Sequence, residues 1–287
     1  MNLARTVAGI AFPNPVLLAG GTAGFGREVT GVMHLERIGG LITKAVSLAP
    51  RAGNRSPRVA EVSGAMLNSV GLANPGVEQV ASRELPWLSA THPAVRVLVN
   101  VVGFTIAEYA EVIAVLDALP GHAGYEINLS CPNSSAGGVE FGADAASVTA
   151  VIAGCRQATR RPLFAKLSPV LPNIPAMARA ARDAGADGVS LVNTMPGAAY
   201  DGPAPRLGNG FGGMSGPALR PVGLLAVQRT AAALPGFPII GVGGISRAEH
   251  VRDYLRAGAA LVAIGTAALA DPRVPERLVA ELELSDG

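Results

Sequence analysis

Short apolar segments recur along the chain, and Gly, Asn, Lys, Ser or Thr stands at or near the end of each. They are rich in Val, Ile and Leu, which is typical of strands in a parallel sheet that helices cover on both faces. The eight segments are 15–21, 40–46, 96–102, 125–130, 163–168, 188–194, 238–244 and 260–266. This recurrence restricts the fold more than any other feature, because few architectures bury eight such strands in one chain.

Alanine-rich stretches with few helix breakers lie between most of these segments. They span 106–119, 145–159, 174–184, 222–233 and 247–257, and a last one spans 273–284. Gly185 and Gly258 follow two of them, as expected past the end of a helix. Eight strand-then-helix units predict an α/β fold, the (β/α)8 TIM barrel, and the 287 residues suit a single domain over 1–287.

Three segments fall outside this rhythm. Residues 6–16 predict a short N-terminal hairpin that leads into the first barrel strand. Residues 49–85 and 200–219 are rich in Pro, Gly, Asn and Ser, and we interpret both as long loops over the barrel mouth. Loops of this length inside a compact domain are usually functional.

Composition excludes several classes of function. The net charge is only +2 and no run of Lys or Arg occurs, which disfavours nucleic-acid binding. The two cysteines are too few for a disulfide framework, a zinc site or an iron–sulfur cluster, and we expect no metal. No apolar stretch reaches the roughly 18 residues of a membrane helix, and we expect a cytoplasmic protein.

Polar residues end several of the apolar strands, where a barrel keeps its active site. Lys44, Asn100, Asn128, Lys166 and Asn193 occupy these positions. Each alone has a simpler interpretation, since Asn commonly caps a turn and a buried lysine can pair with a carboxylate, for which the strands offer Glu126. Their combination favours a shared ligand.

That ligand is predicted to carry a phosphate group. Gly243 and Gly244 end the seventh strand, and Gly265 and Thr266 end the eighth. The loops after these two strands of a barrel commonly bind phosphate through backbone N–H groups and a helix N-terminus. Glycine lets the backbone approach the anion closely.

Cys131 follows the fourth strand in the sequence Asn128-Leu-Ser-Cys-Pro-Asn133. A buried cysteine is often a small hydrophobic residue, but this one lies in a polar turn at the predicted site. There a thiol can act as a nucleophile or as a base. Cys155 lies in an alanine-rich helix, and we expect it in the core.

With these residues in place, the chain resembles the class 1 dihydroorotate dehydrogenases over nearly its whole length. The most specific motifs are Asn128-Leu-Ser-Cys-Pro-Asn133 and Met66-Leu-Asn-Ser-Val-Gly-Leu-Ala-Asn-Pro-Gly76. Further support comes from 43–44, 99–103, 165–169, 192–194, 212–217, 241–245 and 264–267. Segments 58–61 and 85–88 are closer to the B-type than to the fumarate-using A-type.

The resemblance implies FMN at the barrel mouth and dihydroorotate beside it, in pyrimidine (UMP) biosynthesis. The implied FMN contacts are Ala19, Gly20, Lys44, Asn100, Asn128, Lys166, Asn193, Gly216, Gly243, Gly244, Gly265 and Thr266. The implied substrate contacts are Lys44, Asn68, Gly71, Leu72, Asn128, Asn133, Asn193 and Thr194. Cys131 would be the base at C5, while a hydride passes from C6 to flavin N5.

The resemblance also implies partners. B-type relatives work with a second subunit that carries FAD and an iron–sulfur cluster, so a homodimer or a heterotetramer is expected. The sequence leaves the electron acceptor open between NAD through such a partner and a small molecule such as fumarate. Two other hypotheses are a related FMN barrel that reduces another pyrimidine or a tRNA uridine, and a barrel that binds a phosphorylated ligand without turnover.

Overall fold

The computed structural model describes residues 3–130 and 141–284. Within them, eight parallel strands close into a barrel in the order β10-β15-β16-β3-β4-β7-β8-β9, and β9 pairs with β10 to complete the ring. The strands are β3 (Val16–Leu18), β4 (Gly40–Ile42), β7 (Val97–Val101), β8 (Gly124–Asn128), β9 (Leu163–Leu167), β10 (Gly188–Leu191), β15 (Ile239–Val242) and β16 (Leu261–Ile264). Each lies inside or one residue from its predicted segment, and the predicted TIM barrel is confirmed.

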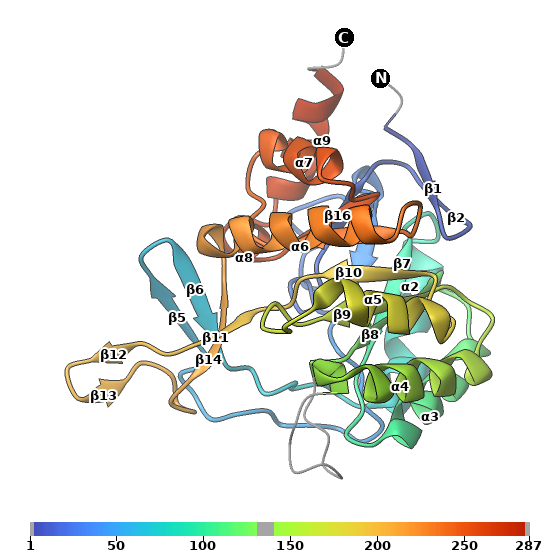
Figure 1. Ribbon diagram of the computed structural model, residues 1–287, viewed down its shortest axis with the longest axis horizontal. Coiled ribbons are helices and arrows are strands. Elements are labelled where there is room, and N and C mark those ends of the chain that lie inside the picture. The colour runs from blue at the N-terminus through green and yellow to red at the C-terminus, as the bar shows by residue number, and fades with distance from the viewer. Residues whose placement is uncertain (1–2, 131–140, 285–287) are drawn as a thin grey trace.

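Helices form an outer layer around this barrel (Figure 1). They are α1 (Val77–Gln79), α2 (Leu85–Thr91), α3 (Ile106–Asp117), α4 (Ala145–Ala158), α5 (Ile174–Asp183), α6 (Arg220–Ala233), α7 (Ala248–Arg256), α8 (Thr266–Ala270) and α9 (Val274–Leu284). Side chains cap three of their N-termini: Thr105, Asp144 and Asn173 each accept a hydrogen bond from the backbone N–H three residues on. Shorter helical turns are η1 (Leu35–Arg37), η2 (Val80–Glu84), η4 (Phe141–Ala143) and η5 (Pro217–Leu219).

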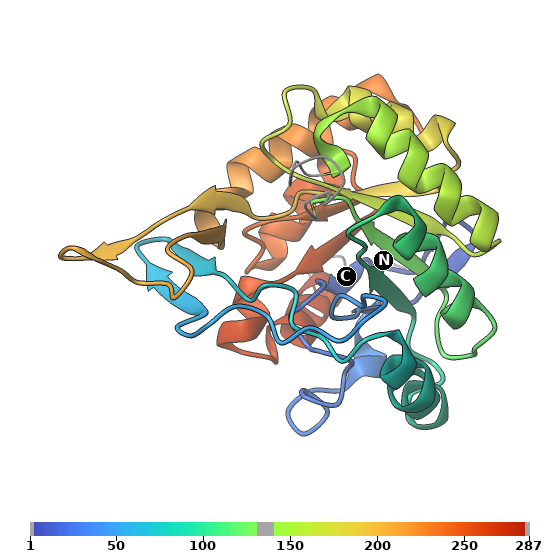
Figure 2. The ribbon, with the colours of Figure 1, turned by 90° about the horizontal axis from the view of Figure 1, so that it is seen from below.

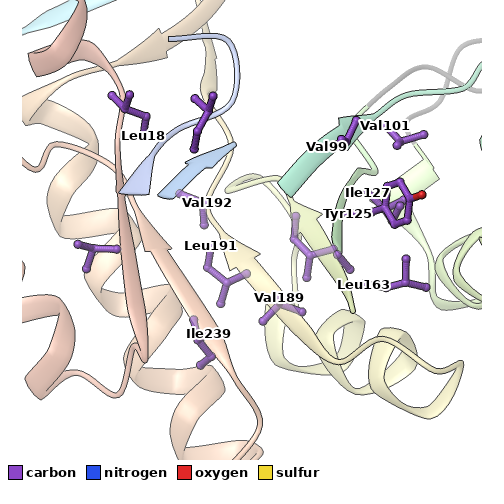
Figure 3. Packing of buried hydrophobic residues seen from close by; sticks show 14 of the residues in the cluster. Leu18, Val99, Val101, Tyr125, Ile127, Leu163, Val189, Leu191, Val192 and Ile239 are labelled. Atoms are coloured by element: carbon purple, nitrogen blue, oxygen red, sulfur yellow. The ribbon is translucent and has the colours of Figure 1, made fainter. Parts of the chain in front are cut away.

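The core lies between strands and helices and continues into the barrel. Figure 3 shows Val99 and Ile127 close together on the neighbouring strands β7 and β8, with Leu191 on β10 in another part of the same core, and all three are fully buried. Cys155 on α4 belongs to this core, as predicted, and its burial raises the pKa of the thiol to about 12. No helix within the described ranges is both long and apolar enough to span a bilayer.

The N-terminal hairpin, β1 (Arg5–Val7) and β2 (Ile10–Phe12), is confirmed. It lies beside the N-terminal ends of the barrel strands, where Phe12 packs with Leu17 and Phe164 inside the barrel. One end of the barrel is therefore filled with apolar side chains, and the ligand site is left to the other end.

The two long loops lie over the barrel mouth as predicted, and they contain short strands that the sequence did not predict. β5 (Val59–Val62) and β6 (Ala65–Asn68) come from the first loop, and β14 (Gly212–Ser215) comes from the second. With β11 (Met195–Gly197) they form a four-stranded antiparallel sheet in the order β11-β14-β6-β5. The small hairpin of β12 (Tyr200–Asp201) and β13 (Ala204–Pro205) projects beyond it, as Figures 1 and 2 show.

Candidate active site

A cavity of about 1030 Å³ opens at the C-terminal ends of the barrel strands. It is walled on one side by the four-stranded sheet, which contributes Met66, Asn68 and Ser215. Every predicted ligand residue within the described ranges lines this cavity: Ala19, Gly20, Lys44, Asn68, Gly71, Leu72, Asn100, Asn128, Lys166, Asn193, Thr194, Gly216, Gly243, Gly244, Gly265 and Thr266. Cys131 and Asn133 lie outside the described residues.

The chain has only two lysines, and both of them line the cavity. Lys166 on β9 is only 7% exposed, and its Nζ lies 3.4 Å from Oε1 of Glu126 on β8. Glu126 is fully buried below the cavity. From the sequence, a pairing of a lysine with Glu126 is the alternative to a shared ligand. The structure has both features, because the paired Lys166 still lines the cavity.

Amide side chains are held in fixed orientations along one wall. Asn193 Nδ2 donates to Asn128 Oδ1 at 3.2 Å, and the Thr194 backbone N–H donates to Asn193 Oδ1 at 2.8 Å. Asn128 Oδ1 also accepts from the Ser130 backbone N–H. Asn68 on β6 donates to the carbonyl of Gly213 on β14, so the sheet fixes this side chain as well. Such amides present donors and acceptors of known direction to a ligand.

The predicted phosphate loops lie at another part of the cavity. Gly243 and Gly244 have φ values of +129° and +68°, in a backbone region that residues with a side chain rarely adopt. A Cβ at Gly244 would lie 2.6 Å from Cβ of Arg220 and 2.9 Å from the carbonyl oxygen of Gly216, so only glycine fits. Tyr254 on α7, whose phenol is buried, donates to the Gly243 carbonyl at 2.8 Å and fixes this loop.

The eighth strand completes this region. Gly265 directly precedes α8, and the Thr266 hydroxyl donates to Ser215 Oγ at 2.8 Å. Backbone N–H groups of such turns are available to an anion, and no carboxylate is among the described residues that line the cavity. The region is therefore suited to a phosphate group.

These features together fit a ligand that carries a phosphate group and further hydrogen-bonding groups. Two buried side-chain oxygens, Asn100 Oδ1 and Ser130 Oγ, have no partner within the described part of the chain. Asn100 and Ser130 both line the cavity, where a ligand can supply the missing hydrogen bonds. Gly20 leaves space beside Asn100, because a Cβ there would meet its Nδ2 at 3.2 Å.

Other lining residues were not singled out from the sequence. Arg51 lies with its guanidinium carbon 4.2 Å from the ring centre of Phe104, and both reach the cavity. Thr22, Ser130, Ser168 and Ser246 add hydroxyl groups. They come from loops after strands, where Ser, Thr and Arg are common for many reasons, so the sequence carried no distinct signal for them.

The fold and the cavity define a TIM barrel with a ligand-sized cavity at its mouth. Residues 2–285 match the family model described as "Dihydroorotate dehydrogenase", and the chain belongs to this family. It is 44% identical over 280 residues, 96% of this chain and 91% of the relative, to the dihydroorotate dehydrogenase B (NAD(+)) catalytic subunit of Pelobacter propionicus. It is also 44% identical over 282 residues, 98% of this chain and 92% of the relative, to a putative dihydroorotate dehydrogenase A (fumarate) of Solibacter usitatus.

A solved structure supports the fold. The dihydroorotate dehydrogenase of Eimeria tenella, in complex with ferulenol, superposes with a TM-score of 0.84 at 21% identity, covering 98% of this chain and 83% of that one. At this identity the likeness shows the architecture alone. The predicted resemblance to the family is confirmed by the family model and by the relatives.

Proposed function

We propose that the protein oxidises dihydroorotate to orotate with FMN as its cofactor, in pyrimidine biosynthesis in the cytoplasm. One observation carries the proposal: every described residue that the family resemblance assigns to FMN or substrate lines a single cavity at the barrel mouth. The relatives support the substrate through their names. FMN is favoured over FAD because the predicted phosphate region is built from two short glycine loops, and no second nucleotide-binding fold accompanies the barrel within the described ranges.

The residues divide the work between the two ligands. Gly243, Gly244, Gly265 and Thr266 would bind the phosphate through their backbone and hydroxyl donors. Ala19, Gly20, Lys44, Asn100, Asn128, Lys166, Asn193 and Gly216 would contact the rest of the cofactor. FMN, when bound, supplies the acceptor for the hydride that leaves C6 of dihydroorotate.

The substrate would be held by charge and by matched amides. Lys44 lies two residues after the end of β4 and would bind the carboxylate of dihydroorotate. Asn68, Asn128, Asn133, Asn193 and Thr194 would pair with the alternating donors and acceptors of its ring. Gly71 and Leu72 both have positive φ, at +70° and +58°, and would bring the backbone against the substrate.

Cys131 would remove the proton from C5. It lies outside the described residues and directly follows in sequence Ser130, which lines the cavity. A thiol has an ordinary pKa of about 8.5, close enough to neutral pH to serve as a base. Asn128 and Asn193, which are bonded to each other, would hold the substrate beside it.

We further propose that the electrons leave through a partner subunit to NAD. The relative from Pelobacter propionicus is named a catalytic subunit, which supports a partner, and a subunit carrying FAD and an iron–sulfur cluster would complete the path in a heterotetramer. The likeness to a putative fumarate-using relative supports the alternative acceptor. Purified protein assayed alone with NAD, fumarate and an artificial dye separates them: dye reduction without NAD reduction is expected, and rapid NAD reduction by the lone chain would contradict the partner.

The cofactor is tested first by purification. The expected preparation is yellow, and denaturation releases FMN and no FAD, as chromatography of the released flavin shows. A colourless protein that takes up no FMN on incubation would overturn the proposal.

A further inference from the structure

One buried charge near the cavity has no part in the scheme above. Glu126 is 0% exposed and does not line the cavity, yet two residues that do line it, Asn100 and Lys166, both bond to it. Asn100 Nδ2 donates to Glu126 Oε1 at 2.6 Å, and Lys166 Nζ lies 3.4 Å from the same oxygen. The other carboxylate oxygen, Oε2, is buried with no hydrogen-bond partner in the described part of the chain.

The strand register explains why these three side chains meet. Glu126 on β8 is the direct partner of Asn100 on β7. Asn128, two residues further along β8, pairs in the same way with Lys166 on β9. Residues two apart on a strand point to the same face, so Glu126 lies one layer deeper in the barrel than Asn128. It therefore lies beside Asn100 and one layer below Lys166, the two residues that line the cavity.

The carboxylate decides what Asn100 offers to a ligand. An ionised carboxylate only accepts hydrogen bonds, so the Asn100 amide must present its NH2 group to Glu126. Its oxygen, Oδ1, is then left over, and it has no partner among the described residues. Asn100 is only 3% exposed, so a ligand in the cavity is the natural donor to this oxygen.

The carboxylate also balances the charge of Lys166. A buried ammonium without a counter-charge is costly, and Glu126 places a carboxylate 3.4 Å from the Nζ of Lys166, which is only 7% exposed. A charge pair below the cofactor acts on its electron affinity, because interactions between charges are strong where water is excluded. Loss of the Glu126 charge would leave the positive charge of Lys166 unbalanced, and this charge would stabilise the electrons added to the flavin.

We propose that Glu126 is a positioning residue for FMN, which orients the Asn100 amide as an acceptor and sets the net charge below the flavin. This inference rests on the proposed function, because it takes FMN as the ligand of the cavity. It concerns a residue that touches neither FMN nor dihydroorotate and acts through Asn100 and Lys166.

The test replaces Glu126 by Gln, which keeps the shape of the side chain and removes the charge. Glu126→Gln is expected to weaken FMN binding about tenfold or more, since a Gln amide can also donate and no longer fixes Asn100. The midpoint potential of the bound flavin is expected to rise. Titration of apoprotein with FMN, followed by the quenching of flavin fluorescence, gives the affinity, and spectroelectrochemical titration gives the potential.

Glu84→Gln is the matched control. Glu84 is also buried, at 8% exposure, and pairs with Arg27 at 2.9 Å, but neither residue lines the cavity. Its replacement is expected to leave FMN affinity and potential as in the wild type. A Glu126→Gln protein that loses thermal stability while both readouts stay at wild-type values would show a structural role only and overturn the inference.

Two further outcomes are informative. If Glu126→Gln does not fold, Glu126→Asp keeps the charge but withdraws it by one methylene, and it must weaken FMN binding; an unchanged affinity contradicts the inference. Wild-type protein that binds no FMN defeats the proposed function, whereas wild-type binding that Glu126→Gln leaves intact defeats this inference alone.

Discussion

The two ends of the barrel use polar residues in opposite ways. At the N-terminal end, Tyr125 donates to Asp117 at 3.1 Å and contacts His122 Nε2 at 2.8 Å, while Thr159 donates to the same Asp117. Arg161 completes this network through the carbonyl of His122 and the Asp117 carboxylate. At the mouth, Asn100 Oδ1, Glu126 Oε2 and Ser130 Oγ have no partner among the described residues.

This difference indicates that the polar residues at the N-terminal end contribute to stability and those at the mouth to ligand binding. Polar groups at the N-terminal end bond mainly to one another, with only His122 Nδ1 of this network lacking a partner among the described residues, and their burial strengthens those bonds. Polar groups at the mouth are fixed on one side and left open on the other, as a binding site requires. We therefore expect substitutions at the mouth to change ligand binding and turnover, and substitutions at the N-terminal end to change stability.

The largest expected effect is at the mouth. Cys131→Ala should lower the rate of flavin reduction by dihydroorotate about 100- to 10,000-fold, the usual cost of removing a general base, while the protein keeps its flavin. Cys131→Ser should retain part of the activity with its optimum at higher pH, because a hydroxyl is a weaker acid than a thiol. Single-turnover stopped-flow measurements check this, and near-normal reduction in Cys131→Ala would remove Cys131 from the role.

The next effect concerns pH at the opposite end. Burial, and then the charge of Arg161, lower the pKa of His122 from 6.5 to about 4. Between pH 6.5 and 4 the unfolded state therefore binds more protons than the folded state does. The free energy of unfolding falls by about 3 kcal/mol as the pH falls through this window. Above pH 6.5 the contribution is fully present. Urea unfolding at several pH values measures it.

A variant pair isolates His122 in that measurement. His122→Gln cannot titrate, so its stability should depend less on pH between 6.5 and 4. His34→Gln serves as the control, since the His34 side chain is 73% exposed, and it should retain the wild-type slope. If the free energy of unfolding depends equally on pH in the wild type and in both variants, His122 is not the source of this pH dependence.

A smaller effect is expected in the glycine loop at the mouth. Gly244→Ala forces a Cβ into contact with Arg220 and into a left-handed backbone, and we expect FMN to bind about tenfold more weakly. Gly236→Ala is the matched control, because Gly236 has φ +76° with open space around its Cβ position. Riboflavin, which lacks the phosphate, should bind both variants equally; a matching loss of riboflavin affinity in Gly244→Ala would argue against a phosphate loop.

The smallest effect is expected in the hydrogen-bond network at the N-terminal end of the barrel. Tyr125→Phe removes the hydroxyl between His122 and Asp117 and should lower the free energy of unfolding by about 1 kcal/mol. Turnover of dihydroorotate should stay at the wild-type value. A large loss of turnover with unchanged stability would contradict the separation of the two ends.

The sequence predicted the barrel well because its strands are buried on both faces and stand out as apolar runs. It did not predict the sheet at the mouth, because β6 and β14 are far apart in the chain and one of them, Gly212–Ser215, is rich in glycine. Their pairing depends on non-local hydrogen bonds that no local pattern reveals.

The site was predictable for a related reason. Lys44, Asn100 and Lys166 are polar residues in apolar strands, and the barrel brings all strand ends to one mouth. Glu126 was noticed only as a possible partner for a lysine. Its contact with both Asn100 and Lys166 depends on the register of three strands, which the sequence alone does not fix.

The most direct test of the whole account is an anaerobic titration of the purified, FMN-loaded protein with dihydroorotate. The account predicts that the visible absorbance of the flavin bleaches in proportion to the dihydroorotate added, with one orotate formed per flavin reduced. An FMN-loaded protein whose spectrum dihydroorotate leaves unchanged, although a chemical reductant bleaches it, would contradict the account.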